Sequence, residues 1–415
     1  MELTADERAM RDGRDGEAAA TAMRILVETA EVMGASRLLA ISRAHIDGCL
    51  YHGEAGLAFA ELLRIQGGRV AVPTTLNVAS LDLVHPGRVR LDAETAAAGR
   101  RLMDAYVAMG CRPTFTCAPY QLPDPPVLGE QIAWAESNAI VFANAVLGAR
   151  TERYGDFIDV CCALTGRAPA VGLHTDEGRR ARAVVRIDAD VRPGLLEESA
   201  GLAALGTVLG HAVGTRIPAI VGLPPETDAD GLKALGAAAA SSGAIAMFHA
   251  VGVTPEAPTL EAALGGGRPD LELVVRAADL RAARDELGAA FDGTLGAVSL
   301  GTPHASATEL DRILATVERD RPVVPVYVNV ARDVLASTDP ERLDASGIIV
   351  VSDTCTYLVP VIADAEGCVM TDSGKWAWYA PGNLGLRPVF ATTRECLRSA
   401  ALGRVWRDDA LWDPR

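Results

Sequence analysis

The chain repeats one local pattern along most of its length: a short apolar run, a polar loop and a segment of helix length. Examples are "SRLLAIS" before "AHIDGCLYHGEAGLAFAELL", "IPAIVGL" before "DGLKALGAAAASSG", and "GAVSLG" before "TPHASATELDRILATVE". Alternating strands and helices are typical of β–α–β units, in which helices cover parallel strands. The pattern therefore predicts an α/β protein whose ligand sites lie at the carboxyl ends of its strands.

The length of the chain predicts more than one domain. Its 415 residues exceed what a single hydrophobic core usually serves, and the strand–helix pattern restarts near Gly201 and again in "RPVVPVYVNV". We expect an N-terminal α/β domain over residues 1–200, a middle α/β domain over 201–330, and a C-terminal α/β segment over 331–415 that completes the site.

Charge and hydropathy exclude several classes of protein. The formal net charge is −15, whereas binding to nucleic acid or to anionic membranes needs a basic surface. No apolar run has membrane-spanning length, and the acidic start "MELTADERAMRDGRDG" does not resemble a secretion signal. We expect a soluble, cytoplasmic protein that binds neither nucleic acid nor membranes.

The eight cysteines are not spaced as a zinc ribbon or a redox motif, because no pair has CxxC spacing. A disulfide framework is not expected in a cytosolic chain of this size. Cys117 lies in a polar loop, "TFTCAPY"; Cys161 opens a short helix in "DVCCALTG"; Cys355 directly follows an apolar strand in "IIVVSDTC". Each could be a buried thiol, and from the residues alone Cys117 could equally be a nucleophile or a metal ligand.

Polar residues follow successive predicted strands, as a shared site between domains would require. They are Arg43, His45 and Asp47; Thr74, Thr75, Asn77 and Ser80; His249; Thr302, His304 and Ser306; and Asp353, Thr354 and Cys355. The structural alternative is that Thr74, Thr75 and Ser306 cap the helices that follow. The chain has only two lysines, Lys233 and Lys375. The second lies in "DSGKWAWYAP", which lacks the upstream glycines of a nucleotide-binding loop.

Eight segments, in order from about residue 40 to 385, resemble the aconitase X family. They are "AHIDGCLYHGEAGLAFAELL", "VPTTLNVASLDLVHPG", "TFTCAPYQLP", "CALTGRAPAVGLH", "FHAVGVTPEAP", "GTPHASATEL", "SDTCTYL" and "DSGKWAWYAP". The resemblance implies an aconitase-like fold of three α/β/α domains around a central iron–sulfur site. It also implies the large subunit of a two-chain enzyme, whose partner is a small swivelling-domain subunit that carries the catalytic Ser.

The resemblance also implies roles for particular residues. Cys117, Cys161 and Cys355 would hold the cofactor, which could be a [2Fe–2S] cluster, a cluster of other nuclearity or a mononuclear iron. Some members have Cys at the position of Thr302. If that Cys is a ligand, this chain lacks it, and Cys161 or the adjacent Cys162 would take its place. The Thr favours the hydroxyproline branch. The predicted catalytic residues are His45, Asp47, His249, His304 and Lys375. The predicted substrate-binding residues are Thr74, Thr75, Asn77, Ser306 and Asp353.

The resemblance therefore predicts a hydro-lyase that converts cis-3-hydroxy-L-proline to Δ1-pyrroline-2-carboxylate. Iron would act as a Lewis acid on the leaving hydroxyl. The first alternative keeps this fold but takes mevalonate 5-phosphate as substrate. A second is a non-catalytic metal-binding or redox-sensing subunit. A third is an enzyme that uses Cys117 as a nucleophile.

Overall fold

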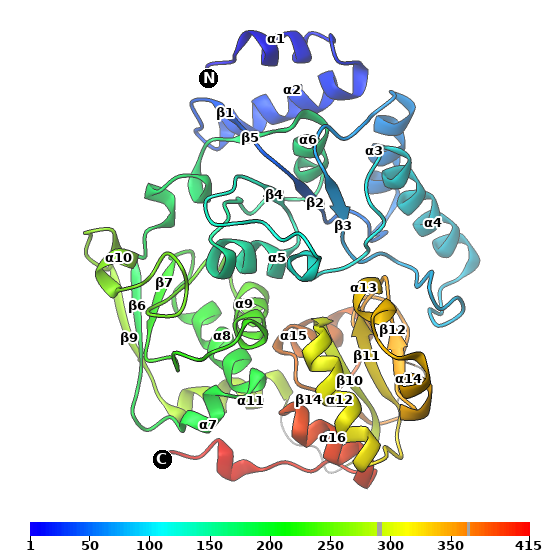
Figure 1. Ribbon diagram of the computed structural model, residues 1–415, viewed down its shortest axis with the longest axis vertical. Coiled ribbons are helices and arrows are strands. Elements are labelled where there is room, and N and C mark those ends of the chain that lie inside the picture. The colour runs from blue at the N-terminus through cyan, green and yellow to red at the C-terminus, as the bar shows by residue number, and fades with distance from the viewer. Residues whose placement is uncertain (289–292, 363–365) are drawn as a thin grey trace. The chain divides into compact units, whose positions relative to one another are not determined.

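The computed structural model describes residues 1–288, 293–362 and 366–415, and its chain divides into two compact units. The first unit comprises residues 1–81 and 91–179, and the second comprises residues 82–90 and 180–415 (Figure 1). Both units combine helices with parallel sheets, which confirms the predicted α/β class. The domain boundaries expected at residues 200 and 330 stay a prediction.

The first unit is built on a small parallel sheet in the order β3-β2-β4. Its strands are β2 (Ala44–Ile46), β3 (Thr74–Leu76) and β4 (Ala133–Trp134), while β1 (Leu38–Ala40) pairs antiparallel with β5 (Arg167–Pro169). The helices are α1 (Ala5–Arg11), α2 (Glu17–Val32), α3 (Glu54–Ile65), α4 (Ala93–Ala108), α5 (Ser137–Phe142) and α6 (Ile158–Thr165). Helix α6 packs against both α2 and β2, so it lies beside the central strand.

The strand predicted at "SRLLAIS" is confirmed, because the run contains β1, but it lies outside the parallel sheet. The parallel sheet uses other segments. The central strands instead contain polar residues, His45 and Thr75, that lie opposite each other in register. The bond between His45 Nδ1 and Thr75 Oγ1 stabilises polar groups within a buried strand pair, which apolar content alone does not predict.

The second unit contains two parallel sheets. The first has the order β8-β7-β6-β9, with β6 (Ala183–Ile187), β7 (Pro218–Val221), β8 (His249–Ala250) and β9 (Leu271–Val275). The accompanying helices are α7 (Pro193–Leu196), α8 (Ser199–Ala212), α9 (Ala229–Ser242), α10 (Leu260–Leu264) and α11 (Ala277–Gly288). Helices α8 and α9 pack closely because of Gly206: a Cβ at this position would lie 2.3 Å from the carbonyl oxygen of Leu235.

The second sheet of this unit carries most of the candidate site. Its order is β12-β11-β10-β13-β14, all parallel, so the carboxyl ends of its strands lie at one edge. The strands are β10 (Leu295–Ala305), β11 (Val326–Val330), β12 (Ile349–Val351), β13 (Cys368–Thr371) and β14 (Pro388–Phe390). The helices are α12 (Ala307–Arg319), α13 (Arg332–Ala336), α14 (Pro340–Ser346), α15 (Gly374–Leu384) and α16 (Thr393–Leu402).

Residues 82–90 belong to the second unit although they are early in the sequence. The Asp82 carboxylate accepts a hydrogen bond from the backbone N–H of Ser352 at 3.0 Å, and the Leu83 N–H donates to Asp353 Oδ2 at 3.0 Å. At the other end, the Arg90 N–H donates to the Pro360 carbonyl at 3.0 Å. This segment therefore holds the chain on both sides of Cys355.

Within the described ranges, none of the helices has both the length and the apolar character that crossing a membrane requires. The cytoplasmic location stays a prediction.

Candidate metal and substrate site

In the second unit, a thiol and an imidazole lie together at the edge of the five-stranded sheet. A ring nitrogen of His304 and the Sγ atom of Cys355 lie within 4.8 Å of each other, and both side chains are buried. The His304 Nε2 atom lies 3.1 Å from the Thr354 carbonyl oxygen, which can only accept, so Nε2 carries the proton and the lone pair of the neutral ring is on Nδ1. Metal-binding histidines commonly donate their second N–H in this way, and thiolate with imidazole suits iron.

Backbone geometry brings His304 to this place. Strand β10 loses its regular pairing with β11 between Leu300 and Ala305, so the residues between them bulge out of the ladder. Gly301, with φ at +76°, begins the bulge, and its missing Cβ leaves room for Asn329. The Asn329 amide donates to the Leu300 carbonyl at 3.0 Å and to Thr302 Oγ1 at 3.1 Å. Asn329 therefore fixes the bulge.

The turn that carries Cys355 is held by an ion pair. Asp353, fully buried, has a φ of +63°, a left-handed conformation that Asp tolerates better than most residues. Arg332 Nη2 donates to its Oδ2 at 2.6 Å, and the bond to Asp353 raises the pKa of Arg332. These contacts give the predicted substrate-binding residue Asp353 a structural function in positioning the turn.

A cavity of about 730 Å³ lies in the second unit, and both lysines of the chain line it. Thr302 and Lys375 contribute to its wall. Lys375 is the second residue of α15, whose N-cap Ser373 accepts a hydrogen bond from the Trp376 N–H at 3.0 Å. A buried ammonium at the start of this helix can bind an anionic group of a ligand.

Lys233, whose site function the sequence did not predict, forms a buried ionic network beside the cavity. Its Nζ atom lies 3.1 Å from Asp230 Oδ1 and also bonds to Glu309. Burial acts to lower the pKa of Lys233, but the two carboxylates raise it overall; burial raises the pKa of Glu309. Ser306 is the N-cap of α12 and donates to Asp230 Oδ2 at 2.8 Å. The structural alternative for Ser306, helix capping, is thus observed.

Asp372 is a second cavity residue that sequence reasoning missed. It follows β13 directly and lines the cavity, and burial raises its pKa to about 6. The available sequence signals were the scarcity of lysine and the position of Asp372 in the "DSGK" segment that precedes Lys375.

In the first unit, four predicted site residues form two bonded pairs. His45 Nδ1 lies 2.8 Å from Thr75 Oγ1, and burial lowers the pKa of His45 to about 3, so its ring is neutral at pH 7. The Asn77 amide donates to Asp47 Oδ1, and the Asp47 N–H donates to Asp159 Oδ2 at 2.8 Å. Neutral imidazole, hydroxyl, amide and carboxylate groups at adjoining strands could orient a polar ligand.

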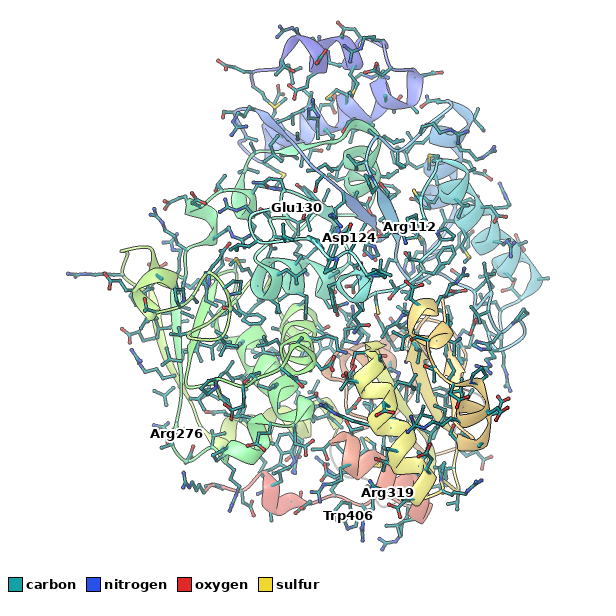
Figure 2. All side chains as sticks on the ribbon, viewed as in Figure 1. Arg112, Asp124, Glu130, Arg276, Arg319 and Trp406 are labelled. Atoms are coloured by element: carbon teal, nitrogen blue, oxygen red, sulfur yellow. The ribbon has the colours of Figure 1, made fainter. Side chains whose placement is uncertain are left out.

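Thr74 and Thr75 also line a smaller cavity of about 160 Å³ in the first unit. Its wall includes Arg112 and Asp124, which Figure 2 labels, and Arg43. Thr74 Oγ1 donates to the Val72 carbonyl at 2.9 Å, so its hydroxyl hydrogen is used within the backbone.

The remaining predicted residues lie in separate elements. Cys117 is buried in the loop after α4, where the Asn138 amide donates to its carbonyl oxygen at 2.9 Å. Cys161 is buried in α6, where burial and the nearby Asp159 raise its thiol pKa. His249 is buried in β8, in the four-stranded sheet rather than the sheet of His304. Catalytic or ligand functions for these residues stay predictions.

The match to known protein families covers nearly the whole chain. Residues 1–177 match the aconitase X first domain, residues 181–285 its second domain and residues 295–402 its third domain. A crystal structure of Thermococcus kodakaraensis aconitase X in its holo-form superposes with a TM-score of 0.86 at 31% identity, covering 96% of this chain and 100% of that one. The expectation of an aconitase-like fold with three domains is confirmed.

Curated relatives are dehydratases of two kinds. Cis-3-hydroxy-L-proline dehydratase of Pseudomonas aeruginosa is 44% identical over 97% of this chain and 70% of its own length; that of Hypocrea jecorina is 41% identical over 97% and 69%. The phosphomevalonate dehydratase large subunit of Methanothermobacter thermautotrophicus is 36% identical over 94% of this chain and 96% of its own length. The chain therefore belongs to the aconitase X family and is a dehydratase, a hydro-lyase.

Proposed function

We propose that this chain dehydrates cis-3-hydroxy-L-proline to Δ1-pyrroline-2-carboxylate and water. The observation that carries the proposal is its 44% and 41% identity to two dehydratases of that name, against 36% to a phosphomevalonate dehydratase large subunit. Thr302, where some family members have Cys, agrees with the hydroxyproline branch. A cavity lined by two lysines and by carboxylates suits a small zwitterion.

We further propose that Cys117 and Cys355 bind the iron cofactor. His304 is an additional ligand candidate because its ring nitrogen lies near the Cys355 sulfur, and Cys161 remains the predicted third thiolate. The buried thiol and imidazole fit iron, since the Thr354 carbonyl already fixes the tautomer of His304. Bound iron would supply Lewis acidity toward the hydroxyl that leaves.

The chemistry defines what the protein groups must do. In the substrate, the hydroxyl and carboxylate share one face of the ring, so the α-hydrogen lies on the other face. An anti elimination removes this proton with a base, breaks the C–O bond and forms an enamine that tautomerises to the imine. We assign Lys375 to the substrate carboxylate, and the base to a Ser of a small partner subunit. The "large subunit" in the name of a relative that this chain covers at 96% of its length supports such a partner.

Co-expression with the adjacent small-subunit reading frame tests the function. We expect the anaerobically purified protein to contain iron and to convert cis-3-hydroxy-L-proline, with little activity on mevalonate 5-phosphate. The 36% identity to a phosphomevalonate enzyme makes that substrate the second candidate. Preferential conversion of mevalonate 5-phosphate would reverse the assignment.

Single Cys→Ser variants test the ligand set. We expect C117S and C355S to lose most of the bound iron, and C161S to lose it if Cys161 is the third ligand. Cys368 is the matched control, because it is also a buried thiol of the second unit but lies within β13. C368S should keep its iron. Full iron in C117S combined with lost activity would favour the alternative of a nucleophilic cysteine.

A further inference from the structure

Among the charged side chains around the large cavity of the second unit, Lys233 has ion-pair partners, whereas Asp372 does not among the described residues. Lys233 is bonded to Asp230 and Glu309, so its charge is already compensated. Asp372 lines the same cavity, yet it makes no ion pair within 4.0 Å among the described residues. A mostly enclosed carboxylate with no paired cation is a natural partner for a cationic ligand group.

The Asp372 side chain is held in place from one side. Thr393 Oγ1 donates to its Oδ2 atom at 2.6 Å, from the start of α16. Burial, followed by the nearby charge of Glu309, raises its pKa to about 6, as expected for a carboxylate that lacks a close cation. The Thr393 bond orients the carboxylate, and a cationic ligand group at the cavity would restore the charge balance.

Asp372 also lies close along the chain to the group assigned to the substrate carboxylate. Strands β10 and β13 are parallel neighbours, with Val298 opposite Met370. Asp372 therefore follows β13 at the same edge of the sheet where β10 carries Thr302, and both residues line the cavity. Lys375 lies three residues further on, in the first turn of α15. An amino acid presents an ammonium and a carboxylate on one carbon, so its site needs an anionic and a cationic group in one cavity, which Asp372 and Lys375 provide.

We propose that Asp372 binds the ring ammonium of the substrate and makes the enzyme selective for amino acids over phosphorylated hydroxy acids. This inference rests on the proposed function. Mevalonate 5-phosphate carries a carboxylate and a phosphate but no cation, so its charge meets repulsion at Asp372. Asp372 is here a specificity-determining residue; the proton removed in the reaction is the one on the α-carbon.

Calorimetric binding tests the inference without turnover. The full chain, purified with its metal and the small subunit, is titrated with L-proline and with tetrahydrofuran-2-carboxylate. The second ligand replaces the ring ammonium with an ether oxygen and keeps the shape. We expect the wild type to prefer L-proline by about 10- to 100-fold, the range for a charge-assisted hydrogen bond. D372N should lose this preference, and D372E should keep most of it.

Two further variants control for position and folding. D320N removes a carboxylate elsewhere in the same cavity wall, at the end of α12, and should leave the preference unchanged. T393V removes the hydroxyl that orients Asp372 while keeping its charge, and should reduce the preference partially. T393V therefore carries the test if D372N does not fold. In turnover, D372N should raise KM for cis-3-hydroxy-L-proline much more than it lowers kcat, with unchanged iron content.

The outcomes separate this inference from the proposed function. Equal binding of both ligands by the wild type, or a full preference in D372N, overturns the function of Asp372. If the wild type prefers L-proline through Asp372 but does not dehydrate the hydroxylated substrate, the inference holds and the proposed function fails. If dehydration proceeds and D372N keeps both its KM and its preference, the proposed function stands and the inference fails.

Discussion

Two histidines of the first unit are buried in the neutral form, each beside a hydroxyl group. His45 lies next to Thr75, and His174 lies between Tyr154 and Gln131. In His174, Nδ1 donates to Gln131 Oε1 at 2.6 Å, and Nε2 accepts from the Tyr154 hydroxyl at 2.5 Å. Burial, then the charges of two arginines, lowers the pKa of His174 to about 4. Protonation of His174 would make both ring nitrogens donors, so Nε2 could no longer accept the hydrogen bond from the Tyr154 hydroxyl.

The linked stability change has a defined sign. Because the folded pKa of His174 is about 4 and the unfolded value is about 6.5, its contribution is complete above pH 6.5 and is lost as the pH falls toward 4. When the pH is lowered from 6.5 to 5, we expect the unfolding free energy of the wild type to fall. The fall in H174Q should be smaller by roughly 1–2 kcal/mol. Denaturant titrations at both pH values measure this. H52Q, which removes an exposed histidine of the same unit, should follow the wild type.

Residues predicted as one site contact each other where neighbouring strands bring polar groups into register. His45 with Thr75, and Asp47 with Asn77, are contacts between residues predicted from the sequence as one site. The Lys233 network was missed because its bonds to Glu309 join positions 76 residues apart. Spacing along the chain carries no signal for such a contact, since only the packing of two helices creates it.

At the scale of elements, Lys233 connects helix α9 to helix α12. Its partner Glu309 is also part of the capping box that begins α12, two residues after the strand that carries His304. K233M would leave the partly buried carboxylates of Asp230 and Glu309 without their shared cation, which we expect to cost about 3–5 kcal/mol. The melting temperature should fall by on the order of 10 °C.

The K233M prediction has a matched control between the same two helices, because Asp228 is the N-cap of α9. Arg312 of α12 faces Asp228 at 3.9 Å in an exposed pair, so R312M should change the unfolding free energy by less than about 1 kcal/mol. K233R should recover part of the loss. Equal melting temperatures of K233M and R312M would show that the buried network contributes nothing to stability.

Helices were predicted better than strands, for a physical reason. Segments such as "DGLKALGAAAASSG" and "TPHASATELDRILATVE" contain all of α9 except Ala229 and all of α12 except Arg319, because helix periodicity and N-caps are local signals. The strands of the first unit have only two or three residues each, too few for a periodic signal. Their pairing depends on segments as distant as β2 and β4, and this explains why the apolar pattern did not locate the parallel sheet.

At the scale of the whole molecule, the segment 82–90 supports the turn that bears Cys355. Asp82 accepts the Ser352 N–H at 3.0 Å and also bonds to His85. D82A would leave a buried N–H without an acceptor, at a cost of about 1–3 kcal/mol, and would loosen the turn. We expect D82A to bind clearly less iron than the wild type, as measured by metal analysis after anaerobic purification.

Asp92 provides the control for D82A. It also accepts a backbone N–H, from Thr95 at 2.9 Å, but as the N-cap of α4 in the first unit. D92A should lose about 1 kcal/mol of stability and keep its iron. A similar loss of iron in D92A and D82A would point to general destabilisation instead of support for the turn.

Because nine early residues are built into the later unit, the polypeptide passes from one unit to the other three times, after residues 81, 90 and 179. No single cut in the gene separates the two bodies cleanly. A fragment that stops at residue 179 contains residues 82–90 but lacks the rest of the second unit to which they belong. A fragment that starts at residue 180 lacks residues 82–90 altogether. Recombination that exchanges one unit between relatives must therefore keep residues 82–90 compatible with the second unit. The two units are thus expected to have been inherited together.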